Sequence, residues 1–212
     1  ATYGDGKLGF DDDDDFESLQ KLRPLNAYGY SKYLFDLYAT RQAARGHSPE
    51  QWAGLKFFNV YGPNEYHKGG MKSVVAQIWP KVQAGEPVQL FRSHHPNYAD
   101  GGQLRDFVFV DDVVDVVDWL LASDEVSGIF NAGSGQARSF ADLARATFAA
   151  VGKEPQITYI DMPEVIRDRY QYFTQARMDR VRELGFDGQS TPLEEGVRRY
   201  VQSYLATDDP WR

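Results

Sequence analysis

The sequence predicts an α/β protein in which strands alternate with helices. Three observations support this prediction. Short apolar runs recur along the chain and end at asparagine, aspartate or glycine, which is typical of buried strands. Stretches with helical start and stop signals lie between these runs. Apolar residues make up 42% of the 212 residues, which is enough for a sizeable core.

In the first half of the chain, each predicted element has a local signal. A proline precedes the first helix and a glycine follows it, an apolar aromatic run precedes Gly62, and a glycine follows the second helix. The predicted elements are, in order, a helix over residues 25–45, a strand over 55–60, a helix over 73–84 and a short strand over 89–91. The acidic run over residues 11–15 lacks the ligand spacing of a calcium loop, so we expect a solvated surface loop there.

In the second half of the chain, residues that can cap a helix N-terminus are the main evidence for the predicted helices. Asp111 and Asp112 are candidates for a helix cap, and Ser139 with Asp142 three residues later resembles a capping box. The predicted elements are, in order, a strand over residues 107–110, a helix to about 121, a strand over 129–132, a helix to about 151, a strand over 157–160, and helices over 177–184 and 193–204.

Composition narrows the classes of partner. The formal net charge of −8 disfavours non-specific binding to nucleic acid or to an anionic membrane. The chain has no cysteine, so disulfides and thiolate metal sites are excluded and a cytoplasmic location is permitted. We find no apolar run long enough to span a membrane. His94 and His95 lack a third ligand at a suitable spacing, so no metal site is predicted.

Two glycine-rich segments resemble nucleotide-binding motifs only in part. Residues 4–9 match the pattern G-x-G-x-x-G, but no strand precedes them and the acidic run that follows would repel a phosphate. Residues 133–135 follow a predicted strand and precede a helix, but Arg138 occupies the place of the third glycine. We expect turns at both places. We also expect that the phosphate-binding half of a dinucleotide fold is missing, because the chain is truncated at its N-terminus.

Tyr28 and Lys32 lie four residues apart on a predicted helix, so both side chains project from one face. A nearby ammonium group favours the phenolate and lowers the pKa of a tyrosine from its ordinary value of about 10. Dehydrogenases use Tyr-x-x-x-Lys in this way to take a proton from an alcohol while hydride leaves to a nicotinamide. Taken alone, the pair is more often a solvent-exposed helical contact, so its interpretation depends on the strands that follow.

Polar residues at the ends of these strands support a binding site. Asn59 comes near the end of one apolar run, before a sharp turn, and Asn131 comes near the end of a later run. Ligands of open α/β sheets bind beyond the carboxyl ends of the strands. Arg105 stands at the entrance of another predicted strand and suits a diphosphate. Together these positions favour the dehydrogenase interpretation.

Five motifs carry a family resemblance. They are Ala-Thr-Tyr-Gly at residues 1–4, Tyr-Gly-Tyr-Ser-Lys at 28–32, Phe-Asn-Val-Tyr-Gly-Pro at 58–63, Arg-Asp-Phe-Val at 105–108 and Asn-Ala-Gly at 131–133. In order and spacing, over essentially the whole chain, they resemble the extended short-chain dehydrogenase/reductases that act on nucleotide sugars. Residues 24–32, 67–71 and 169–176 more closely resemble the ADP-L-glycero-D-manno-heptose 6-epimerases of that family.

The resemblance implies a truncated NAD(P)-binding Rossmann-like domain over residues 1–62. It implies a smaller α/β substrate-binding domain that occupies mainly residues 63–212, with residues 105–133 returning to the Rossmann domain. The implied reaction inverts C6 of the heptose in ADP-D-glycero-β-D-manno-heptose by transient oxidation with bound NADP, or NAD, and supplies lipopolysaccharide core heptose. The implied protein is cytoplasmic and homo-oligomeric, a pentamer in the family, with the ADP-heptose sugar nucleotide as its partner.

The resemblance also implies roles for single residues. Tyr28 and Lys68 are the two bases on opposite sides of C6, while Lys32 holds the nicotinamide ribose and lowers the pKa of Tyr28. Val60 and Lys68 contact the cofactor. The implied substrate contacts are Asn59, Gly70, Gln77, Phe91, Arg92, Ser93, His94, Arg105 and Tyr170.

Departures from the family pattern leave alternatives open. Gly70 stands where the family often has a serine, Gln77 where it often has a histidine, and the loop over residues 95–104 is longer than usual. The family's catalytic serine and phosphate-binding glycines have no counterpart in the chain. A UDP- or GDP-sugar epimerase or 4,6-dehydratase therefore remains an alternative activity, although residues 67–71 argue against both. An inactive substrate-binding fragment is the non-enzymatic alternative.

Overall fold

The computed structural model describes residues 1–167 and 170–211 and confirms the α/β prediction. Arg169, in the C-terminal motif, lies outside the described residues. The strands are β1 (Ala53–Phe57), β2 (Asn59–Tyr61), β3 (Val88–Phe91), β4 (Leu104–Phe109), β5 (Gly128–Ala132), β6 (Ala137–Ser139) and β7 (Ile157–Ile160). The helices are α1 (Phe16–Lys21), α2 (Ala27–Ala44), α3 (Val74–Ala84), α4 (Val110–Leu121), α5 (Phe140–Ala149), α6 (Glu164–Arg167), α7 (Asp179–Glu183) and α8 (Leu193–Tyr200), with a 3-10 segment η1 (Tyr66–Met71) and a π-helical turn η2 (Val201–Leu205).

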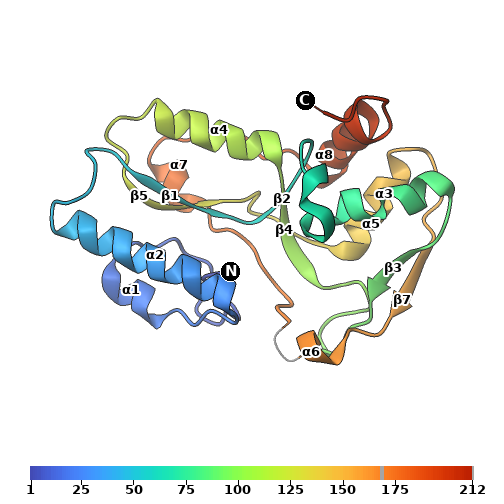
Figure 1. The fold of residues 1–212 in the computed structure, drawn as a ribbon, viewed down its shortest axis with the longest axis horizontal. Helices are drawn as coiled ribbons and strands as arrows, with labels where there is room; N and C mark the ends of the chain where they lie inside the picture. Colours follow the sequence, from blue (N-terminus) through green and yellow to red (C-terminus); the bar gives the residue numbers. More distant parts are fainter. Residues whose placement is uncertain (168–169, 212) are drawn as a thin grey trace.

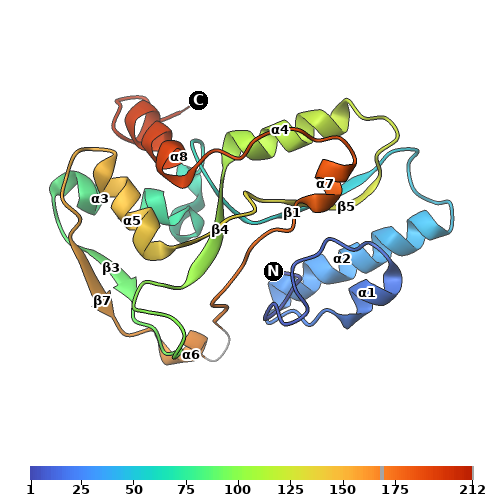
Figure 2. The same cartoon turned by 180° about the vertical axis from the view of Figure 1, so that it is seen from behind.

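Within the described residues, three small sheets form the framework. β1 pairs with β5, β2 with β4, and β3 with β7, all in parallel, while β6 pairs antiparallel with the first residues of β4. β4 lies in the middle of the molecule, between a region that contains β1, β5, α2 and α4 and a region that contains α3, α5, β3 and β7 (Figure 1). The view from behind shows the same division, with α1 beside α2 (Figure 2).

The predicted strand over residues 55–60 is divided at Phe58, so the prediction of one continuous strand was wrong. The Phe58 amide donates to the Ala132 carbonyl oxygen (3.1 Å), and the Val60 amide donates to the Phe58 carbonyl oxygen (3.0 Å). The first contact ends the pairing with β5, and the second folds the backbone back at Phe58. The chain then pairs with β4, so one apolar run serves two sheets.

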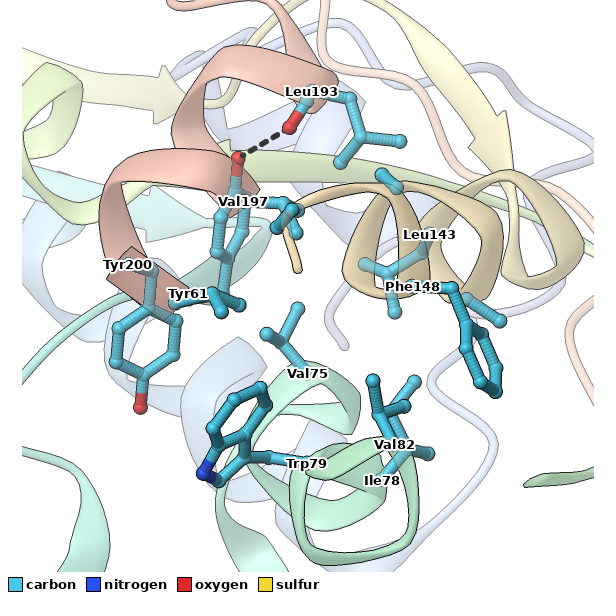
Figure 3. Packing of buried hydrophobic residues seen from close by; sticks show 14 of the residues in the cluster. Tyr61, Val75, Ile78, Trp79, Val82, Leu143, Phe148, Leu193, Val197 and Tyr200 are labelled. Atoms are coloured by element: carbon cyan, nitrogen blue, oxygen red, sulfur yellow. Dashed lines mark hydrogen bonds between the residues drawn. The ribbon is translucent and has the colours of Figure 1, made fainter. Parts of the chain in front are cut away.

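The larger core lies under α3, α5 and α8, and Figure 3 shows its centre. Its largest fully buried side chains include Tyr61, Phe148 and Tyr200. The Tyr61 hydroxyl donates to the Leu193 carbonyl oxygen (3.4 Å) at the start of α8. Gly196 permits this contact, because a Cβ at that position would lie 2.2 Å from the Tyr61 hydroxyl oxygen. A smaller core lies between α4, β5 and α7.

Most other predicted elements are confirmed, with differences at their ends. The strand predicted at 107–110 begins earlier, at Leu104, and α4 starts directly after it with Phe109 at the cap position. Asp111 and Asp112 therefore lie in the first turn, and their prediction as caps was wrong. Asp112 instead accepts hydrogen bonds from the amide (2.8 Å) and hydroxyl (2.6 Å) of Thr191.

The capping box at Ser139 is confirmed: its hydroxyl accepts from the Asp142 amide (2.9 Å), and the Asp142 carboxylate accepts from the Ser139 amide (3.2 Å). α5 ends at Ala149, two residues before the predicted end. The short strand β6 separates residues 133–135 from this helix and was not predicted. Near the C-terminus, α7 is shorter than predicted, and the helix predicted over residues 193–204 is formed by α8 and, directly after it, η2.

The acidic run is a loop, as predicted, and Asp11, Asp13 and Asp15 are exposed, but the run is not wholly solvated. Asp12 is only 5% exposed and accepts a hydrogen bond from the Asn131 amide (2.8 Å). Asp14 pairs with Arg180 (2.5 Å), and Asp15 caps α1 by accepting from the Ser18 amide (2.9 Å). Asp12, Asp14 and Asp15 thus supply acceptors to backbone N–H and arginine groups. A run of aspartates predicts a solvated loop only where the folded chain brings no hydrogen-bond donors to their carboxylates.

Candidate active site

Tyr28 and Lys32 lie in the first turns of α2, whose start is fixed by Asn26. The Asn26 side-chain oxygen accepts a hydrogen bond from the Gly29 amide (2.8 Å) and so satisfies one free N–H group of the helix start. Tyr28 is 65% exposed, and Lys32 Nζ lies 5.5 Å from the centre of the Tyr28 ring. The predicted pair therefore stands together on an accessible face, where the hydroxyl group of a ligand can reach the phenol.

Asn59 and Val60 open β2, beside the parallel strand β4. Asn59 pairs in register with Phe107, and Val60 pairs with Val108. Asn59 is exposed and Val60 is half-buried. Because successive strand residues point to opposite faces, these two side chains face different sides of the sheet. The arrangement allows Asn59 to contact a substrate on one face of the sheet while Val60 contacts another ligand or side chain on the opposite face.

Lys68 is exposed in η1, the segment between β2 and α3. Gly69 follows it with φ of 55° and ψ of −125°, a conformation that only glycine adopts without strain. The Gln77 side-chain amide, from α3, donates to the carbonyl oxygens of Lys72 (2.7 Å) and Gly70 (3.3 Å). Lys68 and Gly70 thus lie in one loop, and Gln77 of α3 binds that loop.

Arg105, in β4, lies among aromatic rings. Its guanidinium carbon is 5.2 Å from the centre of the Tyr170 ring and 5.7 Å from that of Phe140, and Nη1 donates to the Leu104 carbonyl oxygen (2.8 Å). Burial lowers the pKa of Arg105, and the hydroxyl groups of Tyr170 and Tyr98 oppose that shift. In the described part of the chain, Arg105 faces rings and a carbonyl oxygen instead of a carboxylate. Its charge is therefore available to an anionic ligand.

Two further predicted nucleotide contacts adjoin Arg105. The Phe91 ring centre lies 6.4 Å from that of Tyr170, and the Tyr170 and Tyr172 rings are 5.4 Å apart. The His94 amide donates to the Tyr172 hydroxyl (3.0 Å). β3, β4 and the C-terminal motif therefore converge on one cationic, aromatic cluster.

Arg92 and Ser93 are less involved in this cluster. The Arg92 guanidinium pairs with Asp161 at 3.6 Å, and both side chains are exposed. The Ser93 amide donates to Asp100 (2.8 Å), which closes the loop after β3. These two predicted residues have partners within the protein at the edge of the site.

Sequence reasoning missed part of the aromatic cluster. Tyr172 packs against His95 and Tyr98, with ring centres 5.2 Å apart in each pair. The alternation of Tyr170 and Tyr172 in the C-terminal motif was an available signal, because residues two apart on an extended chain share a face. No comparable sequence signal indicated that His95 and Tyr98, from the loop over residues 95–104, would join the aromatic cluster.

Asp106 was also missed, and it anchors the surroundings of Arg105. It is fully buried and accepts hydrogen bonds from the Ser134 amide (2.7 Å) and hydroxyl (2.7 Å), the Gly135 amide (2.9 Å) and the Ala176 amide (2.8 Å). Burial raises the pKa of Asp106, and these donors oppose the shift. The turn over residues 133–135 is thereby confirmed as structural, since its N–H groups bind a carboxylate of the chain.

Two cavities lie away from these residues. One of about 440 Å³ is lined mainly by the acidic run, and one of about 490 Å³ lies between α1, α2 and Trp52. Over the described ranges, no group of histidine, aspartate and glutamate side chains is arranged to hold a metal ion. The helices described in the structure are all too short or too polar to cross a membrane.

Comparison with known proteins identifies the class. The profile of the NAD dependent epimerase/dehydratase family matches residues 1–133, and the chain belongs to that family. It is 53% identical, over 211 residues, to the ADP-L-glycero-D-manno-heptose-6-epimerase of Nitratidesulfovibrio vulgaris strain DP4. That alignment covers 100% of this chain and 64% of the relative, so the chain spans less than two thirds of the relative's length.

Two solved structures are similar. The Helicobacter pylori ADP-L-glycero-D-manno-heptose-6-epimerase matches with a TM-score of 0.66 and 30% identity, over 85% of this chain and 52% of that one. The Thermus thermophilus UDP-glucose 4-epimerase, in complex with NAD, matches with a TM-score of 0.71 and 26% identity, over 93% of this chain and 58% of that one. Both agree with the extended short-chain dehydrogenase/reductase fold that the motifs predict.

Proposed function

We propose that this chain carries the catalytic tyrosine and the substrate-binding residues of an ADP-L-glycero-D-manno-heptose 6-epimerase. The observation that carries the proposal is the Tyr28–Lys32 pair on an exposed face of α2. The 53% identity to a relative of that name supports the choice of sugar. The product would be ADP-L-glycero-β-D-manno-heptose, for lipopolysaccharide core synthesis in the cytoplasm.

Two bases suit an inversion at C6, because the two epimers present their hydroxyl groups on opposite sides of that carbon. In the proposed mechanism, Tyr28 takes or returns the hydroxyl proton on one side and Lys68 does so on the other. Lys32, with its Nζ 5.5 Å from the centre of the Tyr28 ring, holds the nicotinamide ribose beside that tyrosine. Asn59 orients the sugar, and the loop that contains Gly70, together with Gln77 of α3, lines the substrate pocket.

The cofactor proposed is NADP, with NAD as the alternative, and when bound it would supply hydride transfer at C6. Two features of the chain fit the nicotinamide end. The exposed Lys32 ammonium beside Tyr28 can donate to ribose hydroxyls, and the half-buried Val60 offers an apolar contact. Lys68 is the third proposed contact. The solved Thermus relative is a complex with NAD, which supports the class of cofactor.

The nucleotide end of the substrate is proposed to bind at the aromatic cluster. Arg105 binds the diphosphate, and Phe91 and Tyr170 contact the nucleotide or sugar. The proximity of the Arg105 guanidinium to the Tyr170 ring, 5.2 Å from its centre, supports this assignment. Arg92, Ser93 and His94 complete the proposed lining at the edge of the pocket.

The proposed division of the chain assigns residues 1–62 to the cofactor-binding domain and residues 63–212 mainly to the substrate-binding domain. Residues 105–133 return to the cofactor-binding domain, and the pairing of β1 with β5 supports that return. A homo-oligomer is proposed for the whole protein. Leu34 and Phe35 of α2, at 59% and 65% exposure, offer apolar surface for a contact between subunits or domains.

A second candidate is a UDP-sugar 4-epimerase. The higher TM-score to the Thermus enzyme, 0.71 against 0.66, favours it. We prefer the heptose substrate because overall backbone similarity reports the shared fold, whereas the sequence identity is 53% to a relative named as a heptose epimerase and 26% to the Thermus enzyme.

The test is an assay of an enzyme of the relatives' full length that contains this chain. We expect ADP-D-glycero-β-D-manno-heptose to be converted to a mixture of both epimers and UDP-glucose to be left unchanged. Tyr28→Phe should lower kcat at least about 10²-fold, because the removed base acts in the transition state. Tyr38→Phe, the same change on an exposed tyrosine of α2, is the matched control and should retain activity. Turnover of UDP-glucose without the heptose reaction would refute the proposal.

A binding experiment addresses the isolated chain. Without the phosphate-binding glycines, the 212-residue chain should bind NADP only weakly, above about 100 μM, because the pyrophosphate lacks its main contacts. Calorimetric titration measures this directly. Micromolar affinity would contradict the view that the chain holds half of the cofactor site.

A further inference from the structure

The loop that carries Lys68 is closed at its base by one buried carboxylate. Glu65 lies eight residues before Ser73, which is the N-cap of α3, and is only 4% exposed. Its Oε2 accepts from the Ser73 amide (2.5 Å), and its Oε1 accepts from the Ser73 hydroxyl (2.5 Å). The two ends of the exposed loop are therefore joined through a single side chain.

The same carboxylate fixes the loop to the core. The hydroxyl of Tyr200, a fully buried residue of α8, donates to Glu65 Oε1 (2.9 Å). Burial and the nearby carboxylate raise the pKa of Tyr200, so its phenol keeps the proton that it donates. Glu65 also contributes its backbone, because its carbonyl oxygen accepts from the Lys68 amide (3.0 Å).

A buried carboxylate is costly unless donors compensate it, so three donors that converge on one side chain define its position closely. Lys68 lies three residues from this anchor, whereas its own side chain is exposed. The backbone at Gly69, with φ of 55°, gives the loop a sharp bend, and the Gln77 side chain holds the part of the loop beyond that bend. On the side before the bend, the Lys68 amide contacts the Glu65 carbonyl oxygen, so the position of the Lys68 backbone depends on the closure at Glu65.

We propose that Glu65 is the positioning residue for Lys68: by joining the loop ends, it holds the Lys68 amine at the distance and angle that proton transfer at C6 needs. The inference rests on the proposed function, in which Lys68 is the second base. Glu65 itself does not touch the substrate. Its role requires the reach of the side chain, because its two carboxylate oxygens must meet the amide and the hydroxyl of Ser73 at once.

Reach and charge can be separated by two substitutions. Glu65→Asp keeps the charge but shortens the side chain by one methylene, so it cannot meet all three donors. Glu65→Gln loses the charge but keeps the reach: its carbonyl oxygen accepts from the Ser73 amide, and its NH₂ group donates to the Ser73 and Tyr200 hydroxyl oxygens. Tyr200→Phe is the matched control, because it weakens the core contact and leaves the loop closure intact.

The experiment measures kcat and KM of the full-length enzyme with ADP-D-glycero-β-D-manno-heptose. We expect Glu65→Asp to lower kcat at least about tenfold, with KM changed less than about threefold, since a misplaced catalytic group affects the transition state more than binding. Glu65→Gln and Tyr200→Phe should stay within about threefold of the parent kcat. Losses that follow charge, with Glu65→Gln worse than Glu65→Asp, or equal losses in Glu65→Asp and Tyr200→Phe, would overturn the inference.

A double substitution separates this inference from the proposed function. If Glu65 acts through Lys68, then Glu65→Asp combined with Lys68→Met should be no slower than Lys68→Met alone, within about twofold. Multiplying losses would overturn the role of Glu65 and leave the two-base mechanism standing. Full activity of Lys68→Met would instead refute the two-base mechanism itself. Should Glu65→Asp fail to fold, Ser73→Ala removes one donor of the closure and should show a smaller kcat loss that disappears in the Lys68→Met background.

Discussion

Replacing Asp106 by alanine should cost a large part of the stability of the chain. The side chain is fully buried and accepts hydrogen bonds from three backbone amides, at 2.7 Å from Ser134, 2.9 Å from Gly135 and 2.8 Å from Ala176. The substitution leaves those donors without an acceptor. The Ser134 hydroxyl, its fourth donor, has a second acceptor in the Gln136 carbonyl oxygen at 3.2 Å and should lose little.

The magnitude follows from the three amides. An unsatisfied buried donor costs about 1–3 kcal/mol. Ala176 is 3% exposed and should cost the full amount, whereas water can reach Ser134 and Gly135 in part. We therefore expect a loss of about 3–5 kcal/mol, against a total of about 5–15 kcal/mol for a typical domain.

Urea unfolding of the 212-residue chain, followed by tryptophan fluorescence, measures this loss. With a slope of about 2 kcal/mol per molar urea, the midpoint should fall by about 1.5–2.5 M. Asp115→Ala, the same change at an exposed position of α4, is the matched control and should shift the midpoint by less than about 0.25 M. A shift below about 0.5 M for Asp106→Ala, at an unchanged slope, would refute the reasoning that the three amides depend on this carboxylate.

Three further predictions concern packing, pH and binding. Gly196→Ala places a Cβ 2.2 Å from the Tyr61 hydroxyl oxygen and should cost about 1–3 kcal/mol in urea unfolding, whereas Gly70→Ala, in open space, should cost little; equal effects would contradict the packing argument. Hydrogen bonds from Arg198 and Arg199 lower the pKa of Glu195 from 4.5 to about 2. The stability that these ion pairs add to the folded chain is therefore present above pH 4.5 and is lost as the pH falls toward 2. Glu195→Gln should therefore lower the Tm at pH 6 in low salt but not at pH 2, and a difference that persists at pH 2 would refute the assignment. Arg105→Lys should raise KM for the nucleotide sugar about tenfold in the full-length enzyme, because lysine cannot bind a diphosphate in bidentate fashion; an unchanged KM would remove Arg105 from the site.

The sequence predicted the elements whose signals are local. The helix over residues 25–45 and the strand over 157–160 were confirmed because a start signal, an apolar run and a stop signal stand next to one another in each case. The capping box at Ser139 was confirmed for the same reason. Elements that depend on distant partners were not predicted: β6 is a strand only because β4 lies beside it, and α1 is a helix of six residues capped by an aspartate of the acidic run.

The candidate site shows the same limit. The motifs named Arg105 and Tyr170, and the structure brings them together. The positions of Glu65 and Asp106 could not be inferred, because each carboxylate is surrounded by donors that lie 8 to 135 residues away along the chain. Burial of a charged residue is a property of the assembled fold, and a sequence pattern treats such a residue as surface.

The division of the apolar run at Phe58 sets a strict length requirement on the chain. Side chains alternate along a strand with a period of two, so inserting or deleting one residue beside Phe58 exchanges the two faces of β2. The exposed amide of Asn59 would then turn inward, and the apolar Val60 would turn toward solvent. Longer changes in the surface loops would leave that alternation intact. Natural variants of this fold should therefore differ in length at their loops and keep a single residue between the strands that correspond to β1 and β2.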